Sequence, residues 1–388
     1  MLRGFALLGI LVMNIQALAM PAAAYGNPTA YGDLNGVNWW IWVASHVFAD
    51  QKFMAIFSML FGAGVCLFAD RATAKHGKSA GLHYRRTGWL LLFGLAHAHL
   101  IWFGDVLVPY AISALFVYWF RNRRPTTQLI WGVLLLLLPF GFNFALAEAV
   151  QAMPAEEVAE LRLDWKPDAA TLDEELATYR GGWLEQLPDR VEKALFFETV
   201  LLLTYFLWRS AGMMLVGMAL YRWGVLSAKR SLLFYRGLLL VAGGFGLGLI
   251  GTGVAKNIEA NFSFEYTMFL GAQWNYWGSV GLALAYTAAV MLALREELFA
   301  GLMRRLSAAG QMAFTNYISQ SVLCTLLFYG HGLGRFGHFE RWQQALVVVS
   351  VWALQLLWSP WWLQRFRFGP LEWLWRSLTY WKLQPLKR

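Results

Sequence analysis

The chain has 388 residues, of which 58% are hydrophobic and 14% charged, and its mean hydropathy is +0.45. These values lie outside the range of soluble domains and are typical of proteins with several membrane spans. The apolar stretches are continuous runs of about twenty residues, whereas strands of a membrane barrel alternate over about ten. The sequence therefore predicts an all-α, polytopic membrane protein.

Ten apolar runs are predicted to be transmembrane helices, accompanied by interfacial amphipathic helices. The predicted spans are Gly4 to Ala24, Phe53 to Ala69, Trp89 to Gly104, Val106 to Phe120, Leu129 to Ala147, Leu195 to Tyr221, Leu232 to Val254, Trp277 to Leu294, Gln311 to Gly330 and Trp342 to Leu363. We expect one transmembrane domain over 1–388, with five spans in 1–147, an external acidic excursion in 148–194, five spans in 195–363 and a cytoplasmic interfacial tail in 364–388. The first run is interpreted as a membrane helix and not as a cleaved signal.

The formal net charge of +9 comes from 32 Lys and Arg residues and 23 acidic residues. In the ten-span arrangement, the even-numbered loops and both termini share one side, which holds 22 of the basic and 4 of the acidic residues. All other positions hold 10 basic and 19 acidic residues, so the whole excess lies on that side. Because basic loops face the cytoplasm, both termini are predicted to be cytoplasmic, and no nucleic-acid partner is expected.

The cysteines and histidines do not suggest a metal centre. Cys66 and Cys324 fall inside predicted spans, so neither a disulfide framework nor a cysteine-based metal motif is expected. His97 and His99 are two residues apart and point to different sides of a helix, so they cannot both ligate one ion. We therefore expect no metal.

The segment from Phe93 to Ala111, FGLAHAHLIWFGDVLVPYA, is predicted to form the tip of a transmembrane hairpin. Ionisable groups are costly at membrane depth, and their presence there indicates function. His97 lies eleven residues after Arg86, which places both on one helix face and His97 near the midplane. His97 is thus a candidate for chemistry or substrate binding, while Asp105 is either its partner or only a turn residue.

Arg3 and Asn14 are also eleven residues apart, which is close to three helical turns, so they share one face of the first span. One interpretation is a lane from the cytoplasmic rim to the midplane. The other is a positive-inside anchor at Arg3 and an interhelical hydrogen bond at Asn14.

The segment from Tyr25 to Asp50 is expected outside the membrane, as an aromatic belt that leads into the second span. His46 and Asp50 are one helical turn apart within it and are able to interact. They are either ordinary residues of a belt helix or a histidine made more basic by its carboxylate neighbour.

Polar residues in two later spans raise the same choice between structure and binding. Arg209 lies between long apolar runs and keeps its charge there, so we expect an acid, with Asp105 and Asp50 as candidates, or an anionic ligand as its partner. Asn316 and Gln320 lie one turn apart and serve either as contacts between helices or as ligand-binding groups.

Two segments outside the spans have helical patterns. The excursion contains VAELRLDW and LDEELATYRGGWLEQL, which predict short amphipathic helices that are either a solvated excursion or a lid. In the tail, Pro370 marks a helix start, and Glu372 and Arg376 are predicted to form an i,i+4 pair.

Six blocks of the sequence carry a resemblance to a known family. The blocks are RGFALLGILVMN, FSMLFGAG, GLAHAHLIWFGDVLVPYA, GMMLVGMALYRWG, GQMAFTNYISQS and FGPLEWLWRSLTY, and they run from Arg3 to Tyr380. In them the chain resembles the YeiB-like bacterial membrane proteins, a domain of unknown function, which implies a location in the bacterial inner membrane. That family is more distantly similar to transmembrane acyltransferases, including heparan-α-glucosaminide N-acetyltransferase and the O-acyltransferases of cell-surface sugars.

The resemblance to acyltransferases holds unevenly at the residues that matter. In the O-acylating branch, an arginine is followed by a catalytic histidine at the spacing that here joins Arg3 to Asn14. An amide is not a general base at neutral pH, so that mechanism does not transfer to Asn14. The glucosaminide branch has asparagine there and its proposed catalytic histidine between the first two spans, in the segment that here holds His46.

The first functional hypothesis is acyl transfer from cytoplasmic acyl-CoA, acetyl-CoA in the first place, to a hydroxyl or amine of a small molecule or glycan on the outer side. Membrane lipids are expected partners, and a homodimer is an open alternative to a monomer. Arg3, Arg85 and Arg86 are expected to bind the phosphates of the coenzyme. His97 or His46 is expected to remove the acceptor proton, with Asp105 or Asp50 orienting the imidazole. Asn14, Asn316 or Gln320 is expected to bind the oxyanion.

The second hypothesis is a permease or flippase for an anionic or lipid-linked small molecule, in which His97, Arg209 and Asp105 line an anion or proton pathway. The two halves of the chain show no inverted hydropathy repeat, which weakens this hypothesis. The third is a structural or assembly protein without turnover.

Overall fold

The computed structural model describes residues 1–388, apart from the side chain of His76, and within them the fold is all-helical, as predicted. The helices are α1 (Leu2–Ala19), α2 (Ala23–Gly26), α3 (Gly36–Phe48), α4 (Lys52–His76), α5 (Ala80–Leu100), α6 (Leu107–Val117), α7 (Pro125–Gln151), α8 (Ala155–Trp165), α9 (Ala169–Arg180), α10 (Leu187–Phe196), α11 (Leu207–Arg222), α12 (Leu232–Glu259), α13 (Phe264–Tyr266), α14 (Ala272–Arg295), α15 (Ala300–Gln311), α16 (Ala313–Phe328), α17 (Arg341–Arg365) and α18 (Pro370–Tyr380). Two segments are π-helical, η2 (Phe197–Phe206) and η3 (Thr267–Gly271), and η1 (Tyr118–Phe120) is a 3-10 turn.

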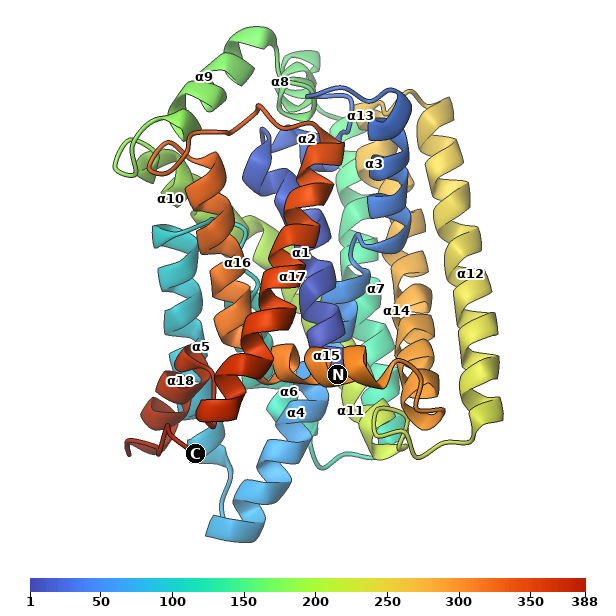
Figure 1. Ribbon diagram of the computed structural model, residues 1–388. Coiled ribbons are helices and arrows are strands. Elements are labelled where there is room, and N and C mark those ends of the chain that lie inside the picture. Colours follow the sequence, from blue (N-terminus) through green and yellow to red (C-terminus); the bar gives the residue numbers. More distant parts are fainter.

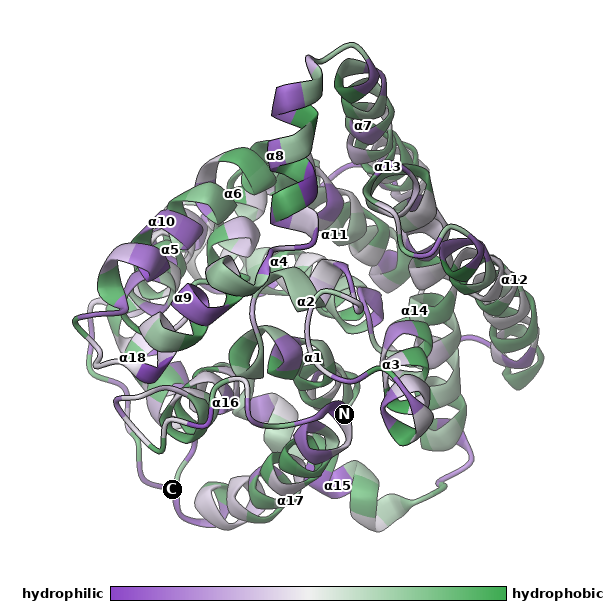
Figure 2. Cartoon of the chain, turned by 90° about the horizontal axis from the view of Figure 1, so that it is seen from above, coloured by the Kyte–Doolittle hydropathy of each residue, from purple (hydrophilic) through white to green (hydrophobic). Residues whose placement is uncertain are grey.

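Helix α1 lies inside the bundle, where it packs against α4, α15, α16 and α17 (Figure 1). In its most apolar window 72% of the residues are buried, against 17% in α7 and 22% in α12, which lie at the edge of the molecule (Figure 2). A helix that is apolar on all sides and still exposed needs an apolar surrounding, which is what lipid provides. Helices α8 and α9 cover one end, and both chain termini lie toward the other (Figure 1).

Seven helical segments are long and apolar enough to cross a membrane. They are Leu2–Ala19, Gly36–Lys75, Pro125–Gln151, Leu187–Arg222, Leu232–Glu259, Phe264–Arg295 and Arg341–Arg365. The other three predicted spans form helices α5, α6 and α16, which do not meet this measure; α6 with η1 covers only Leu107–Phe120, and α16 has 16 residues. The chain is therefore a membrane protein by composition and fold, and the count of ten spans is not confirmed.

Two predicted spans belong to longer helical runs. Helices α3 and α4 fall in one run of 40 residues, Gly36–Lys75, although the predicted start of the second span at Phe53 agrees with the start of α4 at Lys52. That run is broken at Gln51, whose φ of 65° is left-handed and interrupts the helix. Similarly, α10, η2 and α11 run on from Leu187, before the predicted start at Leu195. Broken or widened helices at membrane depth are tolerated where they line a cavity.

Glycines bring α4 and α11 into backbone contact. A Cβ atom at Gly62 would lie 2.0 Å from the carbonyl oxygen of Met214, and one at Gly217 would lie 2.0 Å from that of Met59. The two contacts are reciprocal, one glycine from each helix. Gly64, two residues further along α4, would meet nothing within 4 Å. Of the two glycines in the FSMLFGAG block, only Gly62 is thus needed for this approach.

The tail helix α18 packs against α5 and α16. Glu372 does not pair with Arg376, and that prediction is wrong. Its carboxylate caps the start of α16, where it accepts bonds from the backbone N–H of Phe314 at 2.6 Å and from the Thr315 hydroxyl at 2.6 Å. Burial in this joint raises the pKa of the Glu372 carboxyl. Arg376 stacks instead on the ring of Phe368.

Candidate functional site

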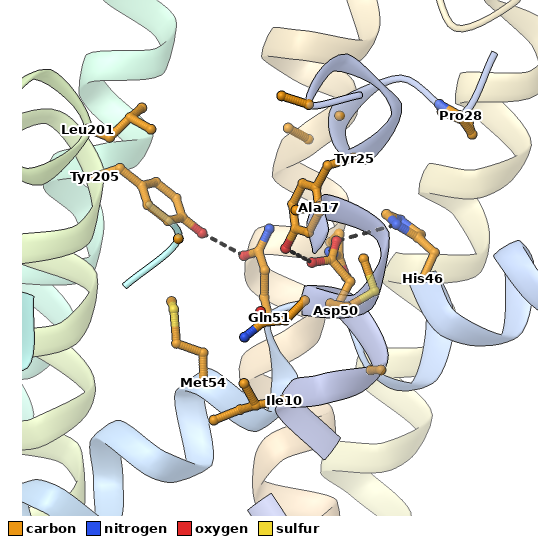
Figure 3. A pocket seen from close by; sticks show the side chains of 18 of the residues that line it. Ile10, Ala17, Tyr25, Pro28, His46, Asp50, Gln51, Met54, Leu201 and Tyr205 are labelled. Carbon is orange, nitrogen blue, oxygen red and sulfur yellow. Dashed lines mark hydrogen bonds and ion pairs between the residues drawn. The ribbon is translucent and has the colours of Figure 1, made fainter. Parts of the chain in front are cut away.

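A cavity of about 470 Å³ lies among α1, the break between α3 and α4, the loop after α5, η2, η3 and the start of α14 (Figure 3). Both π-helical segments line it, through Leu201 and Tyr205 of η2 and Thr267 of η3. Widened turns often occur at functional sites because they re-aim side chains that a regular helix would direct elsewhere. The interrupted α3–α4 run contributes Asp50 and Gln51 to the wall.

The excursion over residues 148–194 forms part of the cavity wall. The two predicted amphipathic helices are present as α8 and α9, and Trp165 at the end of α8 lines the cavity. Its indole N–H donates to the carbonyl of Phe262 at 2.8 Å, and its own carbonyl accepts from the Asn27 amide at 3.2 Å. This placement favours a lid over a purely solvated excursion.

His46 and Asp50 form a histidine–carboxylate pair on the cavity wall (Figure 3). The His46 Nδ1 atom lies 3.4 Å from Asp50 Oδ2, and the ring stacks on Trp42 with centroids 5.4 Å apart. Nδ1–H therefore faces the carboxylate, which leaves the Nε2 lone pair as the free acceptor. Among the described residues, Nε2 has no hydrogen-bond partner, so it is available to a molecule in the cavity.

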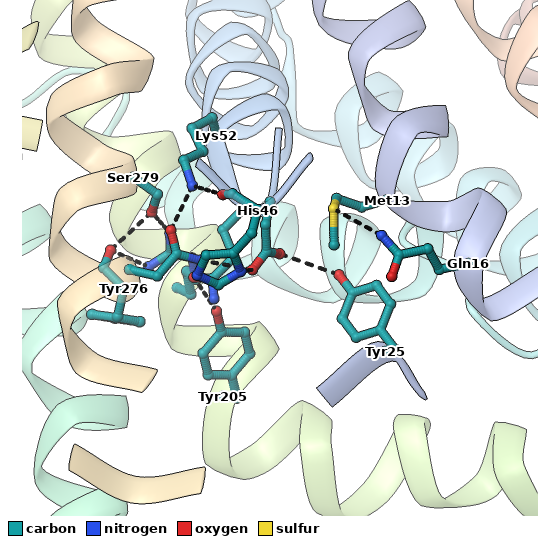
Figure 4. A network of polar contacts seen from close by, with 12 residues as sticks. Met13, Gln16, Tyr25, His46, Lys52, Tyr205, Tyr276 and Ser279 are labelled. Carbon is teal, nitrogen blue, oxygen red and sulfur yellow. Dashed lines mark hydrogen bonds and ion pairs between the residues drawn. The ribbon is translucent and has the colours of Figure 1, made fainter. Parts of the chain in front are cut away.

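A buried network of hydrogen bonds holds the carboxylate of Asp50 (Figure 4). The amide of Asn275 donates to Asp50 Oδ2 at 2.7 Å, and the Tyr25 hydroxyl lies 3.4 Å from Oδ1. Lys52 is fully buried, and its Nζ donates to the Asn275 amide oxygen and, at 2.6 Å, to the carbonyl of His46. Lys52 thus sets the orientation of the amide that holds the carboxylate. The negative charge of Asp50, together with burial, raises the pKa of Tyr25 well above its ordinary value.

Arg209 does not pair with Asp50 or Asp105, so the predicted ion pair is wrong. It is fully buried and donates to the Ser279 hydroxyl at 2.6 Å and to the carbonyl of Tyr276 at 3.3 Å. Its guanidinium also lies 4.3 Å from the centroid of the Tyr276 ring. A carbonyl, a hydroxyl and a π face together replace the counterion. Arg209 is behind the cavity wall and not on it.

His97 and Asp105 come together at the hairpin tip, as the sequence suggested. His97 Nδ1 lies 2.8 Å from Asp105 Oδ1, and Nε2 lies 2.9 Å from the hydroxyl of Ser321. Since Nδ1–H donates to the carboxylate, Nε2 accepts from Ser321 and both ring nitrogens are occupied. Asp105 lines the cavity, but His97 does not. His97 is therefore placed to orient Asp105, and its predicted role in chemistry stays a prediction.

The three predicted oxyanion-binding amides have different surroundings. Asn14 lines the cavity and has no hydrogen-bond partner among the residues described. Asn316 donates to Ser359 at 3.0 Å, while its carbonyl oxygen accepts from Trp358 at 2.7 Å. Gln320 donates to Gln355 at 2.9 Å. Asn316 and Gln320 thus join α16 to α17, and only Asn14 is free to bind a ligand.

A second, smaller pocket of about 100 Å³ lies at the end of the bundle that carries the termini. Arg3 and Arg86 line it, and over the described part of the chain neither guanidinium has a hydrogen bond or an ion pair. The Arg86 guanidinium stacks on the Trp375 ring, with its carbon 4.4 Å from the ring centroid. Arg85, the third predicted phosphate ligand, is not on the wall and stacks on Trp381 at 5.7 Å.

The two pockets are neighbours, because Ile10 and Val106 belong to the walls of both. We call the place of these two shared residues the junction. Tyr317 lines the smaller pocket beside this junction, with its ring 5.2 Å from His97, and its hydroxyl oxygen accepts from the backbone N–H of Val106 at 3.3 Å. The hydroxyl proton of Tyr317 is then free to be donated to a ligand in the smaller pocket. Asn14 follows Ile10 by one helical turn and continues the same face into the cavity.

Comparison with known proteins places the chain in a family. It is 32% identical to the uncharacterized protein YeiB of Escherichia coli (strain K12) over 382 residues, which cover 97% of this chain and 94% of that protein. The chain belongs to the YeiB-like family. Two further members are the uncharacterized protein YxaH of Bacillus subtilis (strain 168), 31% identical over 100% of the chain and 94% of that protein, and an uncharacterized 39.9 kDa protein in the amylase 3′ region of Bacillus acidopullulyticus, 28% identical over 98% and 92%.

The family described as "Protein of unknown function (DUF418)" matches residues 220–382 of this YeiB-like chain. No solved structure matches the chain. The cavity has its walls mainly in the half before residue 220, with Asn257, Phe262, η3 and the start of α14 as the exceptions. The matched region instead supplies Tyr317, Glu372 and Trp375 to the smaller pocket.

Sequence reasoning missed several residues of this YeiB-like site. Gln51, Tyr205 and Trp165 line the cavity, and Tyr317 stands at the junction, but none is charged or unusual in an aromatic-rich membrane protein. One signal was present for Tyr317. It is the neighbour of Asn316 in the family block GQMAFTNYISQS.

Proposed function

We propose that this protein is an acyltransferase that moves an acyl group from cytoplasmic acyl-CoA to a hydroxyl or amine acceptor entering from the outer side. The observation that carries the proposal is the pair of neighbouring pockets that share the wall residues Ile10 and Val106, one with unpaired guanidinium groups and the other with a histidine whose Nε2 is free. The proposal includes ten crossings in the bacterial inner membrane, with α5, α6 and α16 as the three short spans and both termini in the cytoplasm. The basic loops support this orientation.

The smaller pocket is the proposed donor site. Arg3 and Arg86 would bind phosphate groups of the coenzyme at its mouth, because unpaired guanidinium groups suit phosphate oxygens. Arg85, on the adjacent surface, would add charge to the same entrance. The pocket volume of about 100 Å³ favours a short acyl group, acetyl first, on the end of the pantetheine arm.

The chemistry follows from the arrangement at the junction. His46 Nε2 takes the proton from the acceptor hydroxyl or amine, and Asp50 stabilises the imidazolium. The acceptor atom bonds to the acyl carbon, the carbon–sulfur bond breaks, and the leaving thiolate takes the proton from His46. Asn14, from the cavity wall, and Tyr317, from the wall of the smaller pocket, would donate to the oxyanion that forms between these steps.

The residues that line the cavity indicate which kind of acceptor molecule it would bind. Its described lining residues include two carboxylates, Asp50 and Asp105, several amides and three tryptophans, but neither Lys nor Arg. This composition favours a neutral polar molecule, such as a small polyol or a glycan, over an anion. It therefore weighs against a permease for anionic molecules.

Donor binding is tested by thermal unfolding of the purified protein with acetyl-CoA. A ligand at a hundred times its Kd stabilises the folded state by about 2.7 kcal/mol. We expect the shift to shrink in Arg86→Gln and to persist in Arg124→Gln, which removes an exposed arginine outside both pockets. The absence of any shift, together with counterflow of a solute through liposomes, would support the transport alternative.

Transfer is tested with acetyl-CoA labelled in the acetyl group, and with glucosamine and glycerol as amine and hydroxyl acceptors across a proteoliposome membrane. Loss of a general base lowers the rate by about 10²–10⁴. We expect this loss in His46→Gln with donor binding retained. His99→Gln is the matched control, because His99 bonds Glu198 at 3.1 Å and lies outside the cavity. Equal rates in both variants would remove His46 from the mechanism.

A further inference from the structure

Helix α15 lies across the end of the bundle that carries the termini and packs against α17 (Figure 1). A groove of about 480 Å³ runs between the two helices. Two arginines of α15, Arg304 and Arg305, form one side of it. Leu357, Pro360 and Trp361 of α17 form the other. This groove belongs to neither of the pockets described above.

Pro360 explains the position of one arginine. A proline has no backbone N–H, so the carbonyl of Leu356, one turn before it, lacks its helical partner. Arg305 supplies the missing donor, with Nη1 3.1 Å from the Leu356 oxygen. This bond holds the guanidinium at the groove and leaves its other N–H groups for a ligand.

The groove is positively charged. Arg304 makes neither a hydrogen bond nor an ion pair with any residue that the structure describes. Arg365 lies beside the groove, its guanidinium 4.5 Å from the centroid of the Trp361 ring. None of the described lining residues is acidic. Two guanidinium groups therefore line a groove whose described wall holds no carboxylate, and a third stacks on one of its wall residues.

The surface next to these charges is apolar. Leu357 is 60% exposed and Trp361 53%, and at the start of α15 Phe299 is 70% exposed. Tryptophan and arginine beside exposed apolar side chains are typical of the level of lipid headgroups, where one end of a ligand is charged and the other is hydrocarbon. A free anion would use the arginines and leave this apolar surface uncovered.

We propose that the groove between α15 and α17 binds an anionic phospholipid of the inner leaflet. Its phosphate contacts Arg304 and Arg305, and its acyl chain lies along Leu357 and Trp361. Recognition rests on the pairing of guanidinium groups with phosphate oxygens and on the negative surface of that leaflet. The site is independent of the proposed transfer reaction, because no residue of either pocket takes part in it.

The test is lipid binding to the full chain in zwitterionic nanodiscs, measured by native mass spectrometry with phosphatidylglycerol, phosphatidylcholine and inorganic phosphate. We expect phosphatidylglycerol to be retained and the other two to be lost. Arg304→Gln should weaken retention about fivefold, as one basic residue near a charged membrane does. Arg305→Lys keeps the charge, so it should weaken retention less than Arg305→Gln.

Arg123→Gln is the matched control, because it removes an exposed arginine of the same end that lies outside the groove. Its retention should equal that of the unmodified protein. Equal retention of the two lipids, or an equal loss in Arg123→Gln, would refute the site. Retention of inorganic phosphate at the same strength would show an anion site and overturn the lipid assignment.

Discussion

The contact between α4 and α11 gives the sharpest stability prediction. Gly62→Ala would put a Cβ atom 2.0 Å from the carbonyl oxygen of Met214, where a carbon–oxygen contact needs roughly 3.3 Å. The helices must therefore separate by about 1.3 Å or distort. A gap of that size forfeits a quarter to a half of the dispersion energy across the interface, and overpacking usually costs about 1–3 kcal/mol. Because the obstacle is backbone and not a flexible side chain, we expect the upper end, about 3 kcal/mol.

Gly64→Ala is the control for this prediction. It lies on the same helix, and a Cβ there meets nothing within 4 Å. Alanine is a better helix former than glycine by about 1 kcal/mol, so the control variant should be unchanged or slightly stabilised. The assay is unfolding in mixed micelles of increasing dodecyl sulfate content, followed by far-ultraviolet circular dichroism. If the two variants unfold within about 0.5 kcal/mol of each other, the contact does not hold the helices together.

Three further substitutions test the tail and the buried network. Glu372→Ala removes the cap on α16 and should lower the free energy of unfolding by about 1 kcal/mol. Amide hydrogen exchange should then be faster in residues 366–388. Glu372→Gln keeps an acceptor, so its exchange should change less. Lys52→Met leaves the Asn275 oxygen without its charged donor and should cost about 1.5–3 kcal/mol in the same unfolding assay. Gly94→Ala would place a Cβ 2.8 Å from the backbone nitrogen of Val108 and 3.0 Å from Asp105 Oδ2, so both the free energy of unfolding and labelled-acetyl transfer should fall.

Local spacing predicted two of the site's contacts. His46 and Asp50 are one helical turn apart, and His97 and Asp105 flank a single hairpin tip, so chain geometry alone brings each pair together. What spacing could not show is the environment of each pair. The Nε2 atom of His97 is occupied by Ser321, which is more than two hundred residues away in the chain, whereas Nε2 of His46 has no such partner among the described residues.

Two wrong predictions concern charged side chains. Arg209 was expected to find an acid or an anionic ligand because an unpaired charge is costly away from water, and Glu372 was expected to pair with Arg376 because of their i,i+4 spacing. The structure instead surrounds them with neutral hydrogen-bonding groups: a carbonyl and a hydroxyl for Arg209, and backbone N–H groups and a hydroxyl for Glu372. Such groups exist in every segment, so composition gives no indication of where they gather. The break at Gln51 lies in the polar run Asp50–Lys52, just before the predicted start of the second span at Phe53, but this run does not show that Gln51 takes a left-handed conformation.

The buried charges also restrict what the cavity admits. Asp50 and Asp105 are on the wall, while the buried Lys52 and Arg209 are not. An anionic molecule in the cavity would meet the carboxylates first, and a like charge at 4 Å costs about 4 kcal/mol at an effective dielectric constant near 20. A neutral hydroxyl or amine avoids this cost and can still donate its proton to His46. The same placement of charge that disfavours an anion pathway is therefore compatible with an acceptor that arrives uncharged.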